Sequence, residues 1–220
     1  CASMVRENHV LADIGTDHAY LPIWLVKKEV IKKAIASDIN MGPLQKAAFN
    51  IRRYNVGKQV DARLSDGLEL IFPNEADDIV IAGMGGELII KILDEGRHVW
   101  DSVKQFVLSP QSDLDKVRRY LAAHGFAIED EAMVKDEGKY YTVMSVKRGF
   151  MEYESQAHYL FGKILIDKKD VILREYLGRE MLRIEKILVS LQEKDGITDT
   201  ETRAEARISR QKELSWIKEA

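Results

Sequence analysis

The stretch Val10-Leu-Ala-Asp-Ile-Gly-Thr-Asp-His-Ala-Tyr-Leu-Pro22 decides the fold. An apolar run reaches Asp13, breaks at Gly15, and then enters a helical pattern, which predicts a strand, a tight turn and a helix N-terminus. In an α/β sheet such a turn lies at the carboxyl end of a strand, where backbone N–H groups and the helix dipole face a ligand. Asp17 stands where a second glycine would let a pyrophosphate approach, so the loop favours another kind of ligand. The alternative is a plain strand end followed by a turn glycine.

Length and composition indicate a soluble globular protein. The chain has 220 residues, 45% hydrophobic and 31% charged, which suits one sizeable domain and a smaller appendage. Its apolar runs are shorter than the ~20 residues of a membrane span. The start, Cys1-Ala-Ser-Met-Val-Arg6, lacks the features of a signal peptide. A single cysteine excludes a disulfide framework, and no Cys/His cluster has metal-ligand spacing. We therefore expect a cytoplasmic protein with no metal and no membrane partner.

The net charge of −3 is evenly divided, because residues 1–149 hold 20 Lys and Arg against 22 Asp and Glu, and residues 150–220 hold 13 against 14. A bound nucleic acid would therefore need local basic patches rather than a field from the whole molecule. The candidate patches are Lys27, Lys28, Lys32 and Lys33, then Arg52, Arg53 and Lys58, then Lys116, Arg118 and Arg119. The alternative is that each is only a solvated helix face.

Strands and helices alternate through the first two-thirds of the chain. Strands are expected at about 10–15, 33–38, 60–66, 78–82 and 105–108, and helices at 19–28, 40–54, 87–101 and 114–124. Trp24 and Leu88 are expected on the sheet-facing sides of their helices. A hairpin follows, from Phe126 onward and at 140–146, around a polar turn at 135–139. This order predicts a doubly wound, mostly parallel α/β sheet with one antiparallel strand at or near its end.

Four of the five βα strands end in an acidic residue or a glycine: Asp13 and Gly15, Asp38, Asp66, and Gly83 with Met84. The carboxyl ends of such strands share one edge of the sheet, where ligands bind. Asp38 lies 25 residues after Asp13, close to the ~20-residue interval that brings a carboxylate to ribose hydroxyls. Asp66 could accept from an adenine amine, and Asp13 from an ammonium group. The set predicts a zwitterionic nucleoside as ligand.

From about Glu152 the pattern is helical only. Apolar residues recur every three or four positions at Leu173, Leu177, Met181, Ile184, Leu188 and Leu191, and again from Ala204 to Ile217. Asp195-Gly196 is the expected turn, with Thr198 or Thr200 as the next cap. Two long helices joined in this way favour an antiparallel hairpin or coiled coil. These helices could only brace the fold, or their cations at Lys168, Lys169, Arg174, Arg179 and Arg183 could contact nucleic-acid phosphates.

Four segments together, Asp13 to Pro22, Ser37 to Asn40, Ser65 to Gly67 and Ile81 to Gly86, resemble the bacterial tRNA (adenine-22-N1)-methyltransferases. The resemblance implies a class I, Rossmann-like methyltransferase domain at 1–150 and a helical domain at 151–220. It implies transfer of a methyl group from S-adenosylmethionine (SAM) to N1 of adenosine 22 in the D-arm region of tRNA, with S-adenosylhomocysteine as the product. The residues expected to bind SAM are Asp13, Gly15, Thr16, Asp38, Ile39, Ser65, Asp66, Gly67, Ala82 and Gly83.

The fourth strand ends in Ala82-Gly-Met-Gly-Gly86, whereas amino-methylating enzymes of this fold often carry Asn/Asp-Pro-Pro-Tyr/Phe. We therefore do not expect this segment to bind the exocyclic amine of the base. Adenine N1 has a free lone pair, so its methylation needs chiefly alignment. The product base is cationic, and backbone carbonyls near Gly83 and Met84, or the Asp17 carboxylate, could stabilise it. His18 could orient Asp17 or contact the base; alternatively Asp17 and His18 only shape the loop.

Other functions compete with this interpretation. The substrate could be a different RNA site or a small amine, and the chain could be a non-catalytic RNA-binding module that has lost SAM. The carboxylates Asp38 and Asp66 are still present at the strand ends, which argues against a module that has lost SAM. A nicotinamide oxidoreductase is disfavoured by Asp17 at the second glycine position. A monomer is expected, with a dimer as the alternative.

Overall fold

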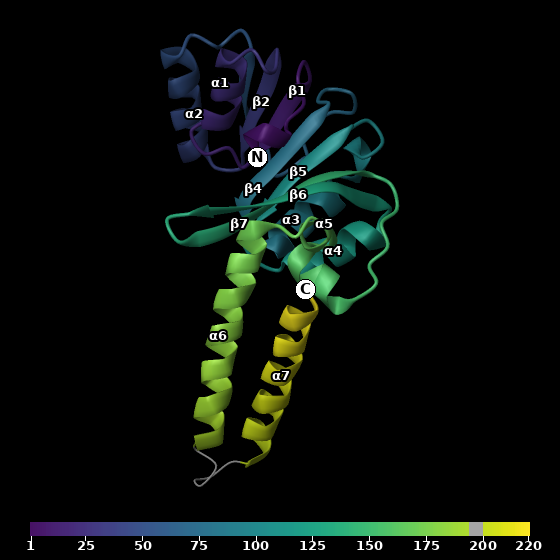
Figure 1. The fold of residues 1–220 in the computed structure, drawn as a ribbon. Coiled ribbons are helices and arrows are strands. Elements are labelled where there is room, and N and C mark those ends of the chain that lie inside the picture. The colour runs from purple at the N-terminus through teal and green to yellow at the C-terminus, as the bar shows by residue number, and fades with distance from the viewer. Residues whose placement is uncertain (194–199) are drawn as a thin grey trace. The chain divides into compact units, whose positions relative to one another are not determined.

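The computed structural model describes residues 1–193 and 200–220 of the chain (Figure 1). These residues form two compact units. The first unit comprises Cys1–Ala132 and Tyr141–Glu152, and the second comprises Met133–Tyr140 and Tyr153–Ala220. Among the described residues, no helix has both the length and the apolar character needed to cross a membrane.

Seven strands form one sheet in the order β3-β2-β1-β4-β5-β7-β6. They are β1 (Val10–Ile14), β2 (Lys33–Asp38), β3 (Val60–Leu64), β4 (Asp78–Met84), β5 (Gln105–Pro110), β6 (Phe126–Asp136) and β7 (Lys139–Arg148). Strands β1 to β5 pair in parallel, and β7 pairs antiparallel to β5, with Phe106 opposite Val146. The predicted mostly parallel sheet with an antiparallel strand near its end is confirmed.

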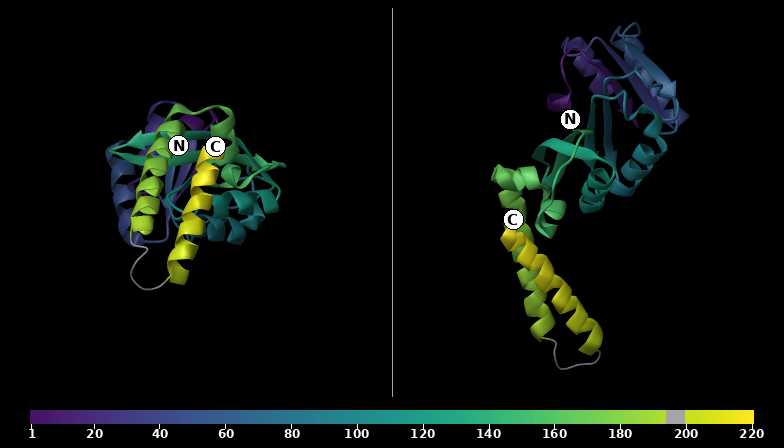
Figure 2. Two further views of the ribbon diagram at one scale, coloured as in Figure 1. Left: turned by 60° about the horizontal axis from the view of Figure 1, so that its bottom comes forward. Right: turned by 90° about the vertical axis from the view of Figure 1, so that its right-hand side faces the viewer.

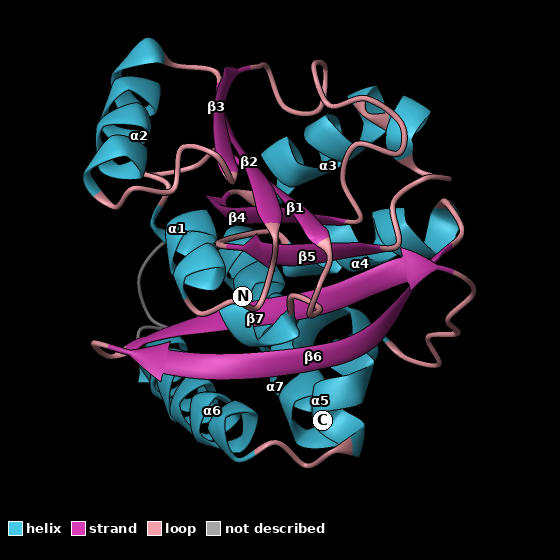
Figure 3. Ribbon diagram, turned by 90° about the horizontal axis from the view of Figure 1, so that it is seen from above, coloured by secondary structure: helices cyan, strands magenta, loops and turns pink. Residues whose placement is uncertain are grey.

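Helices cover both faces of this sheet (Figure 3). They are α1 (Tyr20–Lys27), α2 (Met41–Arg53), α3 (Gly86–Glu95) and α4 (Leu114–Ala123), with short 3₁₀ turns η1 (Ala2–Met4) and η2 (Arg97–Val99). The path from β1 to β3 moves across the sheet in one direction, so right-handed crossovers place α1 and α2 on the same face. The path from β4 to β5 moves in the opposite direction, and α3 and α4 pack together on the other face.

The core of the first unit lies around the central strands. All six residues of β5 are buried, as are four of the five in β1, because helices cover both sides of a parallel sheet. At the amino end of β4, the fully buried Asp78 accepts hydrogen bonds from Arg6 Nη2 (3.0 Å) and His9 Nδ1 (2.9 Å). This contact fixes the N-terminal segment at the sheet edge opposite the strand ends that sequence analysis singled out.

Two helical details differ from expectation. The helix expected to reach Asp101 ends at Glu95, because Gly96 follows as its C-cap and η2 begins a new turn. Trp24 is 49% exposed and Leu88 is 47% exposed, so neither packs on the sheet as predicted. Ile23 and Leu25 fill the buried side of α1, and Ile89 and Ile92 fill that of α3. Successive residues are 100° apart around a helix, so Trp24 and Leu88 point away from the buried side.

The β6–β7 hairpin turns more tightly than the expected five-residue link. Glu137 (φ 45°) and Gly138 (φ 76°) are its only two turn residues, and both are left-handed. A two-residue turn with two positive φ angles matches the right-handed twist of the paired strands. The strands therefore extend to Asp136 and resume at Lys139. Strand β3, in turn, ends at Leu64 rather than Asp66.

The second unit combines the hairpin tip with the C-terminal helices, of which α6 and α7 lie side by side (Figures 1 and 2). The helices are η3 (His158–Gly162, a π-helical turn), α5 (Lys163–Asp167), α6 (Val171–Glu193) and α7 (Thr200–Glu219). Their buried apolar side chains form one cluster with the tip: Met133, Leu165, Leu173, Leu177, Ile184 and Ile217. Arg183 Nη2 on α6 lies 3.4 Å from Glu213 Oε1 on α7. The expected turn at Asp195-Gly196 and the candidate cap Thr198 lie outside the described residues.

Candidate active site

The turn after β1 is organised around a buried carboxylate. Asp13 is 8% exposed, and burial raises its pKa from 3.8 to about 6, against the opposing effect of a 2.6 Å hydrogen bond from Thr16 Oγ1. The Thr16 N–H donates to the Ser37 carbonyl on β2 at 2.8 Å. Gly15 between them has a φ of 70°, which glycine adopts without strain. The turn thus offers an acidic group whose ionisation a neighbouring cation would favour.

The loop then passes through two consecutive left-handed residues, His18 (φ 61°) and Ala19 (φ 56°). Asn50 of α2 is buried, and its Nδ2 donates to the His18 carbonyl at 3.0 Å, which braces this conformation. His18 Nε2 lies 3.1 Å from Asp17 Oδ1, and the Asp17 side chain is 83% exposed. The structure therefore brings Asp17 and His18 together in a backbone conformation that other contacts must hold, as occurs at functional sites.

The end of β4 meets the same turn. A Cβ built on Gly15 would lie 2.0 Å from Met84 Cε, so the Met84 side chain packs directly on Gly15. The pairing with β5 runs from Ala82–Ser109 to Met84–Pro110, which makes Gly83 a bulge residue outside the regular register. Gly83 has a φ of 78°, and a Cβ built on it would meet no described atom within 4 Å. The backbone at Gly83 is therefore open to close approach by a ligand.

The ends of β2 and β3 are joined by backbone contacts. The Ser65 N–H donates to the Asp38 carbonyl at 3.1 Å, and the half-buried Asp38 accepts from the Asn40 N–H at 2.6 Å through Oδ1. Asn40 is the N-cap of α2, but its side chain makes no capping hydrogen bond. The next residue after Asp38, Ile39, is 56% exposed. This part of the rim thus holds one carboxylate and one exposed apolar side chain.

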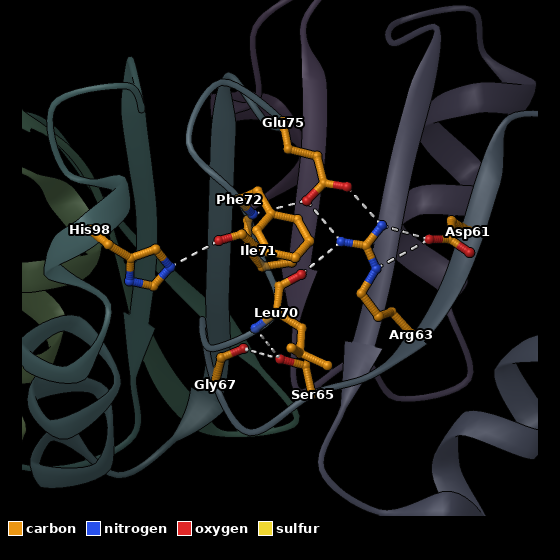
Figure 4. Close-up of polar contacts among 9 residues, drawn as sticks. All are labelled: Asp61, Arg63, Ser65, Gly67, Leu70, Ile71, Phe72, Glu75 and His98. Carbon is orange, nitrogen blue, oxygen red and sulfur yellow. Dashed lines mark hydrogen bonds and ion pairs between the residues drawn. The ribbon is translucent and has the colours of Figure 1, made fainter.

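The loop from residue 65 to 77, which carries Asp66, is held by Arg63 of β3 (Figure 4). Arg63 Nη1 donates to the Leu70 carbonyl and to Glu75 Oε2, and Nη2 donates to Glu75 Oε1, each at 2.8 Å. Glu75 also accepts from the Phe72 N–H at 2.9 Å. The hydrogen bond with Arg63 holds the pKa of Glu75 below its ordinary value. The loop therefore has a fixed path although it contains no helix or strand.

Asp66 lies in the loop that Arg63 holds. It lines a hollow of about 490 Å³ with Glu69, Phe72, Glu95 and His98. Gly67, next to it, packs against Ile92 of α3, 3.2 Å from a built Cβ. His18 lines a different hollow, of about 540 Å³, with residues of α2. These contacts therefore join expected site residues in the Asp13–Gly15–Thr16–Met84 cluster, the Asp17–His18 pair and the Asp38–Ser65 pair, whereas Asp66 lines a hollow with other residues.

Asn50 is a site-supporting residue that the sequence analysis missed. It lies on the buried side of α2 with Leu44, Ala47 and Ile51. A polar side chain on an otherwise apolar helix face needs a buried partner, and that was the available signal. Among the described residues, no group of three or more His, Cys, Asp or Glu is placed to hold a metal ion.

Comparison with known proteins identifies relatives along almost the whole chain. The model of the family described as "TrmK: tRNA (adenine(22)-N(1))-methyltransferase" matches residues 11–213. The tRNA (adenine(22)-N(1))-methyltransferase of Bacillus subtilis is 32% identical over 191 residues, which are 84% of this chain and 80% of that protein.

Two solved structures extend the comparison. A Streptococcus pneumoniae protein in complex with S-adenosyl-L-methionine is 33% identical, with a TM-score of 0.86, over 99% of this chain and 94% of that chain. TrmK of M. capricolum in complex with S-adenosyl-homocysteine is 25% identical, with a TM-score of 0.82, over 99% of this chain and 93% of that chain.

Proposed function

The chain belongs to the tRNA (adenine(22)-N(1))-methyltransferase family, and we propose that it uses the strand ends described above to methylate N1 of adenosine 22 in tRNA from SAM. Relatives solved with SAM and with S-adenosyl-homocysteine support this choice of methyl donor. In this proposal residues 1–150 form the SAM-binding domain, and residues 151–220 form the helical domain.

The buried Asp13 carboxylate is the observation that carries the proposal. Burial raises the pKa of this carboxyl from 3.8 to about 6 by disfavouring its charged form, and the α-ammonium of SAM would stabilise that charged form. Gly15 and Thr16 shape the turn around it, and the open backbone at Gly83 gives the ligand room. The residues present therefore fit a zwitterionic ligand.

The remaining cofactor contacts follow from the positions of the other strand ends. Asp38 is proposed to accept hydrogen bonds from the two ribose hydroxyls, as a carboxylate at the end of the second strand can. Asp66 is proposed to accept from the adenine amine, with Ser65 and Gly67 setting its position. Ile39 and Ala82 are proposed to border the nucleoside.

When bound, SAM supplies an electrophilic methyl group and leaves as S-adenosyl-homocysteine. Because adenine N1 has a free lone pair, the contribution of this chain is chiefly to align N1 with the methyl carbon and sulfur. The backbone carbonyls near Gly83 and Met84 are proposed to stabilise the charge on the base; the Met84 carbonyl also accepts a hydrogen bond from the Gln111 N–H at 2.8 Å. Asp17, oriented by His18 at 3.1 Å, is proposed to stabilise the positive charge that develops on the base.

We further propose that the protein acts as a monomer in the cytoplasm. Its substrate, tRNA, supports the location. Sedimentation of the purified protein with and without tRNA would test the oligomeric state, and a stable dimer would refute the monomer.

Labelled SAM and an unmodified bacterial tRNA transcript provide the direct test. We expect methyl transfer, mapped by nuclease digestion and mass spectrometry to N1 of adenosine 22. Replacing Asp38 by Ala should weaken SAM binding roughly 10- to 100-fold, since hydrogen bonds to a charged group are lost. Because Asp38 also accepts from the Asn40 N–H, Asp38→Asn is needed as well: it keeps an acceptor for that N–H.

The matched control is Asp101→Ala, which removes a carboxylate with a 97% exposed side chain outside the site and should leave transfer unchanged. Asp17→Asn should lower kcat about tenfold or more without altering the Kd for SAM, since a charge-stabilising group acts on the transition state. No SAM binding by the wild-type protein, or methylation only at another position, would contradict the proposed function.

A further inference from the structure

Helices α1 and α2 lie on the same face of the sheet (Figures 1 and 3). Both helices expose aromatic and basic side chains. Six residues, spaced three or four apart along each helix, make up what we call the α1–α2 face: Tyr20, Trp24 and Lys27 on α1, and Lys46, Phe49 and Arg53 on α2. This spacing places each set on one side of its helix. The three aromatic residues are between 49% and 58% exposed, so their rings are not part of the core.

The charge of this region is opposite in sign to that of the chain. Residues 18–58 carry eight Lys or Arg against two Asp or Glu, a net charge of +6, whereas the whole chain carries −3. Neither α1 nor α2 contains an acidic residue. Such a local excess attracts polyanions even when the protein as a whole is acidic.

The cations on the other face of the sheet are already neutralised. There Lys91 pairs with Glu95 at 3.8 Å, and Lys116 pairs with Asp113 at 3.0 Å and with Glu87. Within the described part of the chain, no carboxylate pairs with Lys27, Lys46 or Arg53. The α1–α2 face therefore keeps its positive charge available to a partner.

A hollow on this face includes His18, a residue of the β1–α1 loop. It has a volume of about 540 Å³ and is lined by His18, Gly42, Gln45, Lys46, Phe49 and Asn50. His18 belongs to the same loop as Asp17, and its backbone is held by Asn50 of α2. An exposed ring with a neighbouring cation is the arrangement on which single-stranded bases stack. The hollow is therefore suited to a nucleobase beside the loop that carries Asp17 and His18.

We propose that tRNA docks along the α1–α2 face, with an unpaired base stacked on Phe49 in this hollow and backbone phosphates on Lys46 and Arg53. The inference rests on the proposed function and adds to it the surface that receives the substrate. Phosphate contacts supply affinity and orientation, and the stacked base fixes the register of the RNA.

Replacing Phe49 by Ala tests the stacking contact. The variant should bind the tRNA transcript roughly 5- to 150-fold more weakly, the range for loss of one base–aromatic stack, while its Kd for SAM stays unchanged. Phe49→Trp, which keeps a stacking surface, should restore binding. Phe150→Ala removes an 84% exposed ring elsewhere in the first unit and should bind tRNA like the wild type.

Salt dependence tests the phosphate contacts. Replacing Lys46 and Arg53 together by Ala should reduce the slope of log K for tRNA against log salt concentration by about 1.5, because each lost phosphate contact removes about 0.7–0.9. Lys91→Ala, on the other face, should leave the slope unchanged. All variants should retain the wild-type melting temperature because the replaced side chains are exposed.

The outcomes separate the two proposals. If the wild-type protein fails to bind SAM or to methylate tRNA, the proposed function is wrong. If the wild type methylates tRNA but Phe49→Ala binds it within twofold of the wild type, the docking surface is wrong. If Phe49→Ala instead converts a dimer to a monomer with no change in tRNA affinity, the face is a self-association surface, and the proposal is likewise overturned.

Discussion

The methyl group of Met84 occupies the space beside Gly15 in which any other residue would place its side chain. A Cβ on Gly15 would lie 2.0 Å from Met84 Cε and 3.7 Å from its sulfur. This contact joins the ends of β1 and β4, which are neighbours in the sheet. The turn that follows β1 and the bulge that ends β4 are therefore one packed structure, and a change in either is transmitted to the other.

Replacing Gly15 by Ala should weaken both folding and SAM binding. The left-handed φ of 70° costs an L-residue about 1–2 kcal/mol, and the new methyl group displaces Met84. In the double variant with Met84→Ala, SAM affinity should partly recover while the loss of stability remains. Titration calorimetry and thermal unfolding measure the two effects.

Gly138→Ala is the matched control for that experiment. Gly138 has a φ of 76°, and a Cβ on it would meet no described atom within 4 Å. It should reproduce the loss of stability but leave SAM affinity unchanged. Equal loss of SAM affinity in both variants would show that the Gly15–Met84 contact has no specific role.

SAM affinity should rise with pH through about 6. Burial raises the pKa of Asp13 to about 6, and the proposed ammonium contact requires the ionised form. Below pH 6, affinity should therefore fall by up to about tenfold per pH unit. Asp13→Asn should bind weakly with little pH dependence. A wild-type affinity that is constant between pH 5 and 7.5 would argue against an Asp13–ammonium contact.

The same raised pKa affects stability in the ligand-free protein. The folded-state value lies above the ordinary 3.8, so the contribution of Asp13 is fully favourable below about pH 3.8 and is lost as pH rises through about 6. From pH 4 to pH 7, Asp13→Asn should gain stability relative to the wild type, by up to about 3 kcal/mol for a shift of this size. Urea unfolding of both proteins at several pH values measures this difference.

The Arg63–Glu75 contact should hold the 65–77 loop in place. Glu75→Gln should lower the free energy of unfolding at pH 7 by about 1–2 kcal/mol, as for a hydrogen bond with a charged partner. Because the pKa of Glu75 is lowered from 4.5, this stabilisation is present above pH 4.5 and is lost as pH falls through the lowered folded value. The difference from the wild type should therefore shrink in acid.

Asp61→Asn is the comparison for that variant, since Asp61 also contacts Arg63, at 2.8 Å, but lies on β3 itself. If Glu75 positions the loop, only Glu75→Gln should weaken SAM binding through Asp66. An unaltered Kd for SAM in Glu75→Gln would show that the position of this loop does not affect SAM binding.

The Arg118–Glu131 pair should be the most sensitive electrostatic contact of the first unit. Both side chains are fully buried, and Arg118 Nε and Nη2 donate to Glu131 Oε1 at 3.0 and 2.9 Å. Arg118→Met leaves a carboxylate buried without its guanidinium, which should destabilise the protein by about 3–5 kcal/mol. Replacing Glu131 by Leu in addition should restore much of the loss.

Chemical denaturation measures these changes, with Lys116→Met as the exposed control. Lys116 pairs with Glu87 and Asp113 at the surface, where ion pairs contribute little, so its replacement should leave stability unchanged. A similarly small effect of Arg118→Met would mean that the buried pair is not needed for folding.

The fold could be predicted because strands and helices alternate and characteristic residues mark where the strands end. Glycine or aspartate follows the apolar strands, and the β-branched run at 78–82 forms part of the central strand β4. The errors at Trp24 and Leu88 have one cause: spacing shows which residues can share a helix face, whereas burial depends on how each helix meets the sheet. The end of α3 is a separate error, set by Gly96 and the new turn η2.

The candidate site was only partly predictable for a similar reason. The grouping of strand ends follows from parallel topology, which places carboxyl ends on one edge. The left-handed pair at His18 and Ala19, the bulge at Gly83 and the Arg63 contacts depend on partners that become neighbours only on folding. Asn50, for example, braces a carbonyl 32 residues away in sequence, and no local pattern encodes that distance.

The β6–β7 hairpin limits where the chain can be truncated or recombined. Its tip, Met133–Tyr140, belongs to the second unit while both flanking stretches belong to the first, so the chain passes between the units three times. A stop codon after Glu152 would remove the apolar side chains that pack on Met133 and Tyr140. The remaining β-hairpin would expose these residues and be prone to aggregation. Recombination that exchanged only the C-terminal helices would do the same. The helices and the hairpin tip must therefore be exchanged together. Removing the second unit from the first also requires that the tip be replaced by a short polar turn.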